Sequence, residues 1–367
     1  MNIAYVANIR LPTERAHGYQ IMRVCSELAA LGHTVTLYVP KRRNHIGNDS
    51  FEYYGIEKNF SIVFISTLDL IPFSSFLGPV AFWLSEYFFA RALSIPKDSI
   101  IYTRDHHTLS YLVGRGYQCF YNAHNWESHR KRYIQRARGV ICNSTGTEKA
   151  IREAIALPTV VVANATDPNP YIGTDKDMLR EELKLPKRPI ALYAGHLYAW
   201  KGVETIYEAA RIASHFSFVF LGGTESDIRT AKEKTRDIHN VSFLGHRKKS
   251  EVPKFLVAAD VLLLTATIRS GESLWYTSPI KLFEYMASDT PIVASDVPSI
   301  REVLSDKTAV LVAPDDAKGL VEGIQIALEK NKSRAHAALD LSRRYTWSAH
   351  AAAVSSFFEN NVTTRKS

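Results

Sequence analysis

Short apolar runs and longer amphipathic segments alternate along the chain in the order typical of parallel α/β proteins. Residues 1–9, MNIAYVANI, predict an opening strand. After a polar loop, apolar side chains recur at helical spacing, at Ile21, Val24, Leu28 and Leu31. A second apolar run, TVTLYVP, completes a strand–helix–strand unit. Because no GxGxxG lies between the first strand and the helix, this unit lacks the dinucleotide-binding fingerprint.

A second series of apolar runs begins at Arg188 and passes through FSFVFLGG, VSFLGH and ADVLLLTAT. Between the two series, the Pro- and Asp-rich stretch 167–177 is typical of a linker. A chain of 367 residues with 46% hydrophobic residues is sufficient for two domains, each with its own core. We therefore expect an α/β protein with two Rossmann-like domains, the first at 1–167 and the second at 178–345.

Residues 273–302, SLWYTSPIKLFEYMASDTPIVASDVPSIRE, combine a helix start with a buried strand. Pro279 suits the first turn of a helix, and Ser278 before it can cap the free backbone N–H groups. The helix is expected to run from Ile280 to Ala287, and PIVAS after it predicts a buried parallel strand. The free N–H groups and the positive end of the helix dipole would attract a diphosphate.

Two charged residues make this helix start more specific. Lys281 adds a positive charge in the first turn, and Glu284 follows one turn later. A carboxylate at that position is too far along the helix to cap it, but it can accept hydrogen bonds from both hydroxyls of a ribose. The segment therefore predicts a nucleotide-sugar site. A solvated Glu284 in an ordinary helix–strand unit is the alternative.

The segment resembles the donor-binding segment of glycosyltransferase family 4, the large retaining family with the GT-B fold, and especially its members that carry SPxKLFEYMAxGxPIVAS. The resemblance implies two Rossmann-like domains whose parallel sheets face each other across a cleft, the N-terminal one binding the acceptor and the C-terminal one the donor. A final helix, 346–362, would pack back on the N-terminal domain. Glu284 would hold the ribose. The diphosphate would be held by the loop of Ser278, Pro279, Ile280, Lys281 and Leu282.

Residues 190–210, IALYAGHLYAWKGVETIYEAA, resemble the GRLxxxKG element of the same family. The resemblance implies that Lys201 is a phosphate ligand, whose ammonium would neutralise charge on the leaving nucleoside diphosphate. His196 stands where the family usually has Arg, and its charge depends on pH. The nucleotide base would contact the backbone from Gly245 to Arg247. A solvated turn lysine is the alternative for Lys201.

One position departs from the family pattern. The family's usual signature is two glutamates separated by seven residues, and the first of them falls at Tyr276. The substitution leaves either a variant sugar contact through Tyr276 or a weakened active site. Glu272 is four residues too early to replace the missing glutamate. The resemblance also implies that some members with the SPxKLFEYMA form lack the first glutamate, so inactivity does not follow.

The N-terminal half contributes two further candidates through the resemblance. Gly18, in the loop after the first strand, would approach the donor phosphates, and a plain helix start is the alternative. His124 lies in YNAHNWE at the end of a strand and would position the sugar rather than act as a base. His124 and Lys201 are the two candidate catalytic residues. Other histidine or basic residues occur near it in the sequence, at His106, His107, His129, Arg130 and Lys131.

Positive charge is concentrated in the N-terminal half. Residues 1–165 contain 18 Lys and Arg against 12 Asp and Glu, whereas residues 166–367 contain 27 against 25. The runs KRR at 41–43 and RKRYIQRAR at 130–138 suit anionic lipid headgroups, an anionic glycan or a lipid-diphosphate acceptor, and equally a solvated surface. Peripheral contact with an anionic membrane is thus one reading. No nucleic-acid-binding module is recognisable, so no nucleic-acid partner is expected.

An uncharged stretch rich in Phe and Trp, LIPFSSFLGPVAFWLS, lies between Asp69 and Glu86. Its 16 residues, interrupted by Pro72 and Pro79, fall short of the ~20 that a membrane helix needs. A buried helix is the favoured interpretation. The alternatives are a wall of the acceptor cleft and a segment that lies on a membrane surface.

The remaining chemistry of the chain is sparse. Cys25, Cys119 and Cys142 occur singly in apolar surroundings, which predicts small core residues rather than a disulfide or a metal site. We expect no metal and no cofactor, with a nucleoside-diphosphate sugar as substrate only. No signal peptide opens the chain, which predicts a cytoplasmic protein, either free or peripheral to the inner face of the membrane.

Together with these features, the resemblance implies a retaining hexosyltransferase that moves a sugar from a nucleoside-diphosphate sugar to a glycan, lipid-linked or other acceptor in cell-surface glycan or glycolipid biosynthesis. A GT-B epimerase would need acidic and basic residues on both faces of the sugar ring, and Tyr276 stands where an acid is required. The second alternative is a non-catalytic glycosyltransferase-like chain that serves as a partner subunit or binds anionic surfaces. Hydrolysis of the donor without acceptor separates enzyme from binder.

Overall fold

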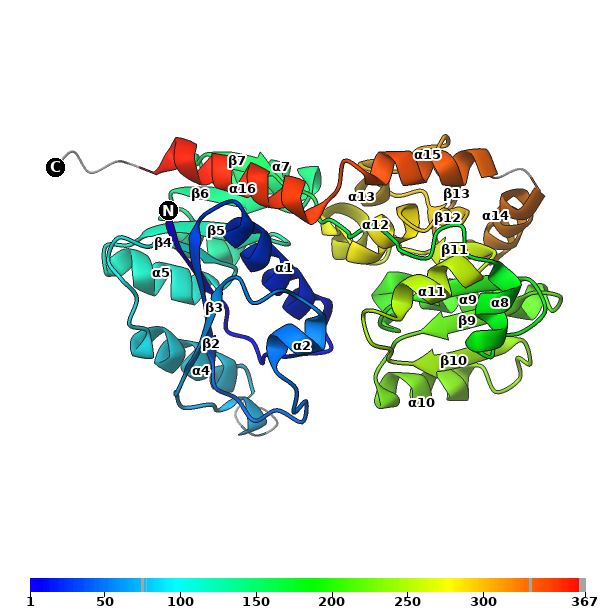
Figure 1. Ribbon diagram of the computed structural model, residues 1–367, viewed down its shortest axis with the longest axis horizontal. Helices are drawn as coiled ribbons and strands as arrows, with labels where there is room; N and C mark the ends of the chain where they lie inside the picture. The colour runs from blue at the N-terminus through cyan, green and yellow to red at the C-terminus, as the bar shows by residue number, and fades with distance from the viewer. Residues whose placement is uncertain (74–75, 77, 330–331, 363–367) are drawn as a thin grey trace. The chain divides into compact units, whose positions relative to one another are not determined.

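The computed structural model describes residues 1–73, 76, 78–329 and 332–362, which form two compact units (Figure 1). Unit 1 comprises Met1–Ala163 and the C-terminal segment that begins at Trp347. Unit 2 comprises Asn164–Thr346.

Unit 1 is built on a parallel seven-stranded sheet with the order β3-β2-β1-β4-β5-β6-β7. The apolar runs MNIAYVANI and TVTLYVP contain strands, as the sequence pattern predicted, and the central strand β4 is buried along its whole length. The strands are β1 (Asn2–Val6), β2 (Thr34–Pro40), β3 (Ser61–Ile65), β4 (Ile100–Thr103), β5 (Gln118–Ala123), β6 (Gly139–Cys142) and β7 (Thr159–Val161).

The helices of unit 1 alternate with these strands, and the last one follows unit 2 in the sequence. They are α1 (Ala16–Ala30), α2 (Ser50–Tyr54), η1 (Ile71–Phe73), α4 (Pro79–Ala92), α5 (His106–Gly114), η2 (Ser128–Arg130), α6 (Lys131–Ile134), α7 (Thr145–Ala154) and α16 (Trp347–Asn361). Helix α1 buries Ile21, Val24 and Leu28 as expected, but Leu31 lies beyond its last turn and is exposed.

The C-terminal helix α16 packs against α1. Trp347, at its start, is buried and meets Tyr19 of α1 with ring centroids 6.1 Å apart. His350 Nδ1 lies 2.8 Å from the carbonyl oxygen of Ala163, so Nδ1 carries a proton and donates it there. These contacts join the end of the chain to unit 1. The three cysteines are unpaired and buried, which confirms the prediction that they are core residues.

Unit 2 contains a parallel six-stranded sheet with the order β10-β9-β8-β11-β12-β13. Its strands are β8 (Ile190–Ala194), β9 (Ser217–Leu221), β10 (Val241–Gly245), β11 (Val261–Leu264), β12 (Ile292–Ser295) and β13 (Val310–Val312). Strands β8, β9, β11 and β12 are buried throughout, which is the pattern expected of a parallel sheet covered by helices on both faces.

The helices of unit 2 include α12 (Ile280–Met286), which carries Lys281 and Glu284. They are α8 (Lys176–Glu182), η3 (Ala199–Lys201), α9 (Val203–Ile212), α10 (Glu225–Lys234), α11 (Val252–Ala258), η4 (Glu272–Tyr276), α12 (Ile280–Met286), α13 (Pro298–Arg301), α14 (Ala317–Glu329) and α15 (Lys332–Ser342). Helix α12 starts at the predicted residue and ends one residue earlier than predicted. Helix α8 occupies part of the stretch that was expected to be a linker.

The strand order reverses in the middle of each sheet. In unit 2 the chain runs outward from β8 to β9 and β10 and then returns to β11 on the other side of β8. The loops that leave the carboxyl ends of β8 and β11 therefore diverge and leave a crevice between them, where open parallel sheets bind ligands. The same reversal occurs between β1 and β4 in unit 1.

The apolar stretch 70–85 does not form a buried helix as favoured above. Helix α4 buries Ala81, Ser85, Phe89 and Ala90, but several of its large apolar side chains are exposed. Residues 74, 75 and 77 of the stretch lie outside the described residues. Among the helices that the structure describes, none has the length and apolar character of a membrane span.

Candidate functional site

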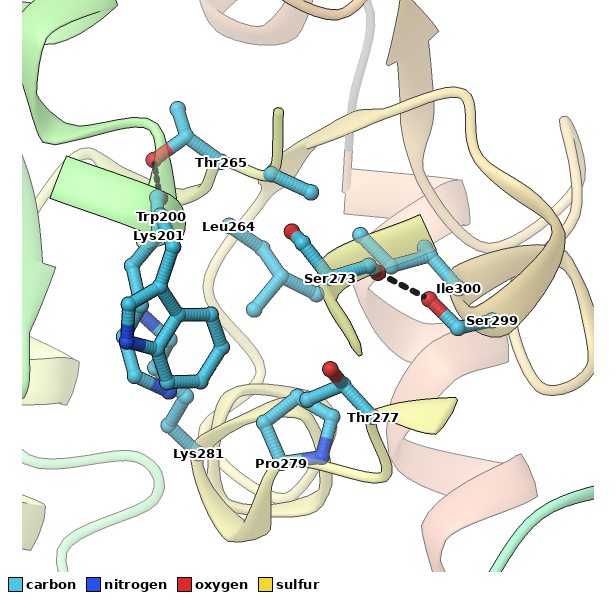
Figure 2. Close-up of a pocket in the computed structure, with 11 residues that line it drawn as sticks. Trp200, Lys201, Leu264, Thr265, Ser273, Thr277, Pro279, Lys281, Ser299 and Ile300 are labelled. Atoms are coloured by element: carbon cyan, nitrogen blue, oxygen red, sulfur yellow. Dashed lines mark hydrogen bonds between the residues drawn. The ribbon is translucent and has the colours of Figure 1, made fainter. Parts of the chain in front are cut away.

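A pocket lies at the reversal of strand order in unit 2, next to the carboxyl end of β11 (Figure 2). The turn at η3, the end of η4 and the first residues of α12 and α13 form the rest of its wall. Its lining residues are Trp200, Lys201, Leu264, Thr265, Ala266, Ser273, Thr277, Pro279, Lys281, Ser299 and Ile300. Lys201, Pro279 and Lys281 are the predicted site residues that the structure brings together here.

Lys201 is held by a tight backbone approach. Gly202 after it has φ +69°, and a Cβ at that position would lie 2.9 Å from the carbonyl oxygen of Ala266. Thr265 Oγ1 donates a hydrogen bond of 2.8 Å to the carbonyl oxygen of Lys201. The lysine Nζ lies 4.2 Å from the ring centroid of Trp200. Burial lowers the pKa of Lys201 to about 8, against the opposing charge of Glu272.

Lys281 comes from the first turn of α12 and enters the same pocket. Its Nζ is buried, has no hydrogen-bond partner among the described residues and lies 3.6 Å from the ring centroid of Tyr193. Burial, together with the charge of Lys201, holds the pKa of Lys281 well below its usual range. Figure 2 shows Lys201, Lys281 and Trp200 together on one side of the pocket.

Hydroxyl groups form the opposite part of the wall. Ser299 Oγ donates to the carbonyl oxygen of Ser273 at 2.8 Å, and Ser273 Oγ accepts from the N–H of Thr267 at 3.2 Å. Thr277 Oγ1 donates to the carbonyl oxygen of Glu272 at 2.6 Å. The pocket lining contains the side chains of two buried lysines and no carboxylate, so the pocket suits an anion. A bound anion would reduce the repulsion between the two ammonium groups and would accept a hydrogen bond from Lys281 Nζ.

A turn built from glycines stands beside the pocket, at the carboxyl ends of β8, β9 and β10. The N–H of Gly222 donates to the carbonyl oxygen of Gly245 at 2.9 Å, and the N–H of Gly195 donates to that of Leu221 at 2.8 Å. Gly222 has φ +113°, and a Cβ there would lie 2.7 Å from the carbonyl oxygen of Gly195. Only glycine allows this approach. Sequence reasoning missed Gly222, although the pair GG directly after FSFVFL was its signal.

His196 follows this turn and does not line the pocket described above. Tyr193 Oη donates a hydrogen bond of 2.8 Å to the carbonyl oxygen of His196. The imidazole ring of His196 is stacked on the ring of Tyr198, with centroids 5.0 Å apart. Its Nδ1 lies 4.0 Å from a carboxylate oxygen of Asp227. A protonated imidazole would therefore face an acid here. Arg247, two residues beyond the end of β10, is exposed.

Glu284 forms an ion pair with Lys249, a residue that sequence reasoning did not single out. The Glu284 side chain is largely buried, at 13% exposed, so its charge requires a partner. Lys249 comes from the loop after β10, and the basic run HRKK directly after VSFLG was the signal that could have identified it. A ribose bound at Glu284 would have to share this carboxylate with Lys249.

Ser278 does not cap α12 as predicted. Its Oγ accepts a hydrogen bond of 3.3 Å from the backbone N–H of Asn164, and its carbonyl oxygen accepts from the Asn164 side-chain amide. The residue before α12 is Pro279, without a side-chain cap. Asn164 thus holds the loop from which α12 starts. Asn164 and Ser278 lie far apart in the sequence, so a pattern of neighbouring residues could not show this contact.

Three neighbouring candidates lie away from the pocket lining. The N–H of Leu282 donates to the carbonyl oxygen of Pro279 at 3.0 Å, so this amide has a partner within the helix, and its side chain belongs to the core. Ile280 is half-buried at the first position of α12. Tyr276, the residue that replaces the family glutamate, is half-buried at the end of η4.

Gly18 and His124 belong to unit 1. Gly18 lies in the first turn of α1 and not in a loop, contrary to expectation. A Cβ there would overlap Tyr54 Oη and lie 2.6 Å from Cγ2 of Thr13. The hydroxyl of Tyr54 in turn donates to the carbonyl oxygen of Thr13 and accepts from its N–H, both at 2.8 Å. Packing of α1 against α2 therefore requires glycine at this position.

His124 follows the last residue of β5. Its carbonyl oxygen accepts from the Asn143 side chain at 3.2 Å, and its Nε2 is buried with no hydrogen-bond partner among the described residues. Burial and the nearby charges of Arg104 and His17 lower its pKa well below the usual range, so the imidazole is neutral. In the part of the chain that the structure describes, no group of three or more His, Cys, Asp or Glu side chains is placed to hold a metal ion.

Comparison with known proteins finds a family model that matches part of unit 2 and curated relatives that match part of the chain. The model of the family described as "Glycosyl transferases group 1" matches residues 175–338. N,N'-diacetylbacillosaminyl-diphospho-undecaprenol alpha-1,3-N-acetylgalactosaminyltransferase of Campylobacter jejuni is 28% identical over 167 residues, 45% of this chain and 42% of that protein. Alpha-D-kanosaminyltransferase of Streptomyces kanamyceticus is 30% identical over 144 residues, 37% and 35% of the two chains. The chain thus matches less than half the length of either relative.

Solved structures match over nearly the whole chain. Sucrose-phosphate synthase from Thermosynechococcus elongatus has a TM-score of 0.76 at 18% identity, covering 98% of this chain and 99% of its own. HepE of Anabaena, in complex with UDP and glucose, has a TM-score of 0.73 at 16% identity, covering 98% and 100%. WaaG, a glycosyltransferase involved in lipopolysaccharide biosynthesis, has a TM-score of 0.66 at 14% identity, covering 97% and 99%. These similarities confirm the expected GT-B fold with two Rossmann-like domains.

Proposed function

We propose that the chain is a retaining glycosyltransferase of the family 4 type, which moves a hexose from a nucleoside-diphosphate sugar to a glycan or lipid-linked acceptor in cell-surface glycan or glycolipid biosynthesis. The observation that carries the proposal is the pair of buried lysines in one pocket of unit 2, Lys201 and Lys281. The family match over 175–338 supports it, because that match includes the whole pocket. No cofactor takes part in the proposed reaction.

In the proposed binding mode, the donor diphosphate lies between the ammonium groups of Lys201 and Lys281. The phosphate oxygens provide the hydrogen-bond acceptor that Lys281 Nζ lacks among the described residues. Glu284 accepts the ribose hydroxyls and exchanges part of its ion pair with Lys249 for these hydrogen bonds. UDP sugars are the first donors to test, since HepE, which shares the fold, was solved with UDP and glucose.

In the proposed reaction, the bond between the anomeric carbon and the diphosphate oxygen breaks, and the acceptor oxygen bonds to the same face of the sugar. The acceptor proton passes to the departing phosphate oxygen, so no side chain need act as a base. Lys201 and Lys281 stabilise the charge that develops on the leaving diphosphate. His124 is neutral and positions the sugar or the acceptor through its unpartnered Nε2. Tyr276 takes the place of the missing glutamate near the sugar.

Acceptor and location belong to the same proposal. One relative is by its name a transferase acting on a diphospho-undecaprenol-linked sugar, which makes a lipid-linked acceptor a specific candidate for this chain. Peripheral contact with the inner face of an anionic membrane would bring the protein to such an acceptor. The alternative function is a non-catalytic partner subunit, favoured by the single observation that Tyr276 replaces the usual glutamate.

A panel of UDP-, GDP-, ADP- and CMP-sugars should raise the melting temperature with one nucleotide class only, because a ligand that binds the folded state stabilises it. A free ligand concentration of 100 Kd corresponds to about 2.7 kcal/mol. Lys201→Met and Glu284→Gln should abolish the shift. The matched control is Lys234→Met, which removes a half-exposed lysine of the same unit that pairs with Glu204.

The same panel separates the two functions. Release of nucleoside diphosphate from the stabilising donor, with product of unchanged anomeric configuration once an acceptor is present, supports the transferase. A stabilising donor that is never turned over, with or without acceptor extracts, would favour the binding protein. Absence of a shift with every donor would contradict both the donor site and the proposed function.

Nucleotide affinity should also fall as the pH rises above about 8. The pKa of Lys201 is about 8 in the folded protein and about 10.4 in an unfolded chain, so Lys201 makes the unfolding free energy increase with pH between these values. A bound diphosphate favours the charged lysine and shifts this pKa upward. Binding therefore takes up a proton, and the Kd for UDP should increase about tenfold between pH 7 and pH 9.

Titration calorimetry with UDP in buffers of different ionisation enthalpy measures the proton uptake directly. Lys201→Arg is the matched variant, because a guanidinium stays charged over the whole range and should flatten the pH dependence whatever its affinity. An unchanged pH dependence in Lys201→Arg would assign the titration to another group.

A further inference from the structure

Exposed aromatic side chains follow the chain of unit 1 from β3 through η1 to α4. We call this surface the aromatic face and define it by Phe64, Phe73, Phe76, Phe82, Trp83 and Tyr87. Phe76 is 90% exposed and Trp83 51%, although both belong to residue types that are normally buried. Several large apolar side chains exposed along one stretch of chain are typical of an interaction site.

Helix α4 already has a separate core face. Ala81, Ser85 and Phe89 are buried on one side, where α4 packs against α5, and Ser85 Oγ accepts from the N–H of Leu70 at 2.8 Å. On the other side, Trp83 and Tyr87 are stacked with ring centroids 6.0 Å apart. Helix α4 therefore has a second apolar side, which belongs to the aromatic face and which the described residues of unit 1 do not cover.

The aromatic face carries no outward negative charge. Between Ser61 and Arg91 the sequence has two acidic residues, Asp69 and Glu86. Asp69 pairs with Arg42, with Nε and Oδ1 3.5 Å apart, and also accepts from the N–H of Ile71. Glu86 accepts from the backbone N–H of Thr108 at 3.0 Å and from its hydroxyl at 3.3 Å. Both carboxylates are thus turned inward and hydrogen-bonded.

Positive charges border the same surface. Arg91 is exposed one helical turn after Tyr87, on the side of α4 that carries Trp83. Lys41 is exposed at the end of β2, where its N–H donates to the carbonyl oxygen of Ile65 in β3. Arg43 is exposed two residues further on. Aromatic rings flanked by basic side chains match the headgroup region of an anionic bilayer, where rings lie at the interface and cations meet lipid phosphates.

We propose that the aromatic face docks unit 1 onto an anionic lipid bilayer, with Trp83 and its neighbours in the headgroup region and Arg91, Lys41 and Arg43 on the lipid phosphates. A second copy of this chain is a poorer occupant, because a symmetric contact would bring the same basic residues together and offer them no acidic partner. The proposal deepens the membrane contact that the proposed function includes and names the surface that would make it. It would hold for a non-catalytic chain as well, so a failure of flotation leaves the donor site and the proposed sugar transfer untouched.

Vesicle flotation of the full chain tests the proposal. The protein should float with vesicles of phosphatidylcholine mixed with phosphatidylglycerol, less with phosphatidylcholine alone, and less in high salt. The double variant Phe82→Ser/Trp83→Ser should bind the mixed vesicles at least about tenfold more weakly, because it removes two rings from the interface. Both residues are exposed, so the fold should be unaffected. Ile212→Ser, on the surface of unit 2 and also 51% exposed, is the matched control and should bind normally.

Quenching by brominated phosphatidylcholine tells the bilayer from any protein partner. Tryptophan fluorescence should be quenched on vesicle binding, and Trp83→Phe should keep binding while it loses most of this quenching. No flotation with either vesicle type, or equal flotation of the parent and the double variant, would overturn the proposal. So would a dimer in sedimentation velocity that the double variant converts to a monomer, since the face would then be an interface between copies.

Discussion

Lys281→Met is expected to make the folded protein more stable and at the same time to lower its turnover of the donor sharply. The lysine Nζ is buried, has no hydrogen-bond partner among the described residues and lies in the same pocket as Lys201. An uncompensated buried charge costs several kcal/mol, and Tyr193 returns only about 2 kcal/mol or less through its ring. Methionine has a similar length and no charge, so unfolding should require about 2 kcal/mol more.

The same substitution removes one of the two cations proposed for the leaving diphosphate. Loss of one preorganised electrostatic contact in a catalytic site lowers turnover about 100-fold or more. Stability and activity should therefore change in opposite directions, which a merely structural lysine would not produce. The sign of the pH effect follows as well. The pKa of Lys281 is lower in the folded than in the unfolded protein, so the unfolding free energy of the parent increases as the pH rises. The unfolding free energies of parent and variant should therefore become equal in alkaline solution.

Urea unfolding of parent and variant at neutral and alkaline pH measures the stability difference, and nucleotide release from the donor measures turnover. Lys234→Met again serves as the control, because its ammonium is half-exposed and paired. A Lys281→Met protein that is less stable than the parent would show that the lysine is satisfied in the free protein. A stabilised variant with full activity would remove Lys281 from the proposed site.

Gly222→Ala is expected to destabilise unit 2 by about 3 kcal/mol or more. The added Cβ would lie 2.7 Å from the carbonyl oxygen of Gly195, and φ of +113° is unfavourable for alanine even without that contact. The position of a Cβ is fixed by its own backbone, and the carbonyl oxygen of Gly195 is itself a backbone atom, so a side-chain rotation cannot relieve the clash. The loop from Gly195 to His196 would have to move away from β9, and donor affinity should fall with the stability.

Gly271→Ala provides the matched control in the same unit. Gly271 has φ of −58°, and a Cβ there would meet nothing within 4 Å. Its substitution should change the unfolding free energy by about 0.5 kcal/mol or less. Urea midpoints of the two alanine variants, with equal m-values, test the comparison. Equal stability of the two would mean that the strands at Gly222 can separate without cost.

The local pattern of the chain was sufficient for the elements and their order. Buried strands such as IALYA and PIVAS, and the helix that starts at Ile280, could be recognised because each depends on a few consecutive residues. Glu284 was singled out by its place one turn into the helix, and Lys201 through a family resemblance that is tightest at 190–203 and 276–302. The cap by Ser278 was predicted and not found, because Asn164 competes for the same hydroxyl from more than a hundred residues away.

The apolar stretch before α4 shows a different limit. Composition indicates that a segment is apolar, but not which of its faces the rest of the unit will cover, and the structure leaves Phe76 and Trp83 exposed. Likewise, sequence position could not reveal that Gly18 is required by Tyr54. In both cases the missing information is a contact between elements distant in the sequence.

By itself the sequence therefore determined two α/β units, their strands, and the motif that carries the proposed donor site, since hydrophobic period and turn chemistry act within a few residues. The tertiary structure alone decided that Lys249 neutralises Glu284, that Gly222 lets two strand ends meet, and that Lys281 Nζ is buried with no hydrogen-bond partner among the described residues. These facts depend on which loops the parallel sheet brings to its carboxyl edge, and that is set by the reversal of strand order between β8 and β11.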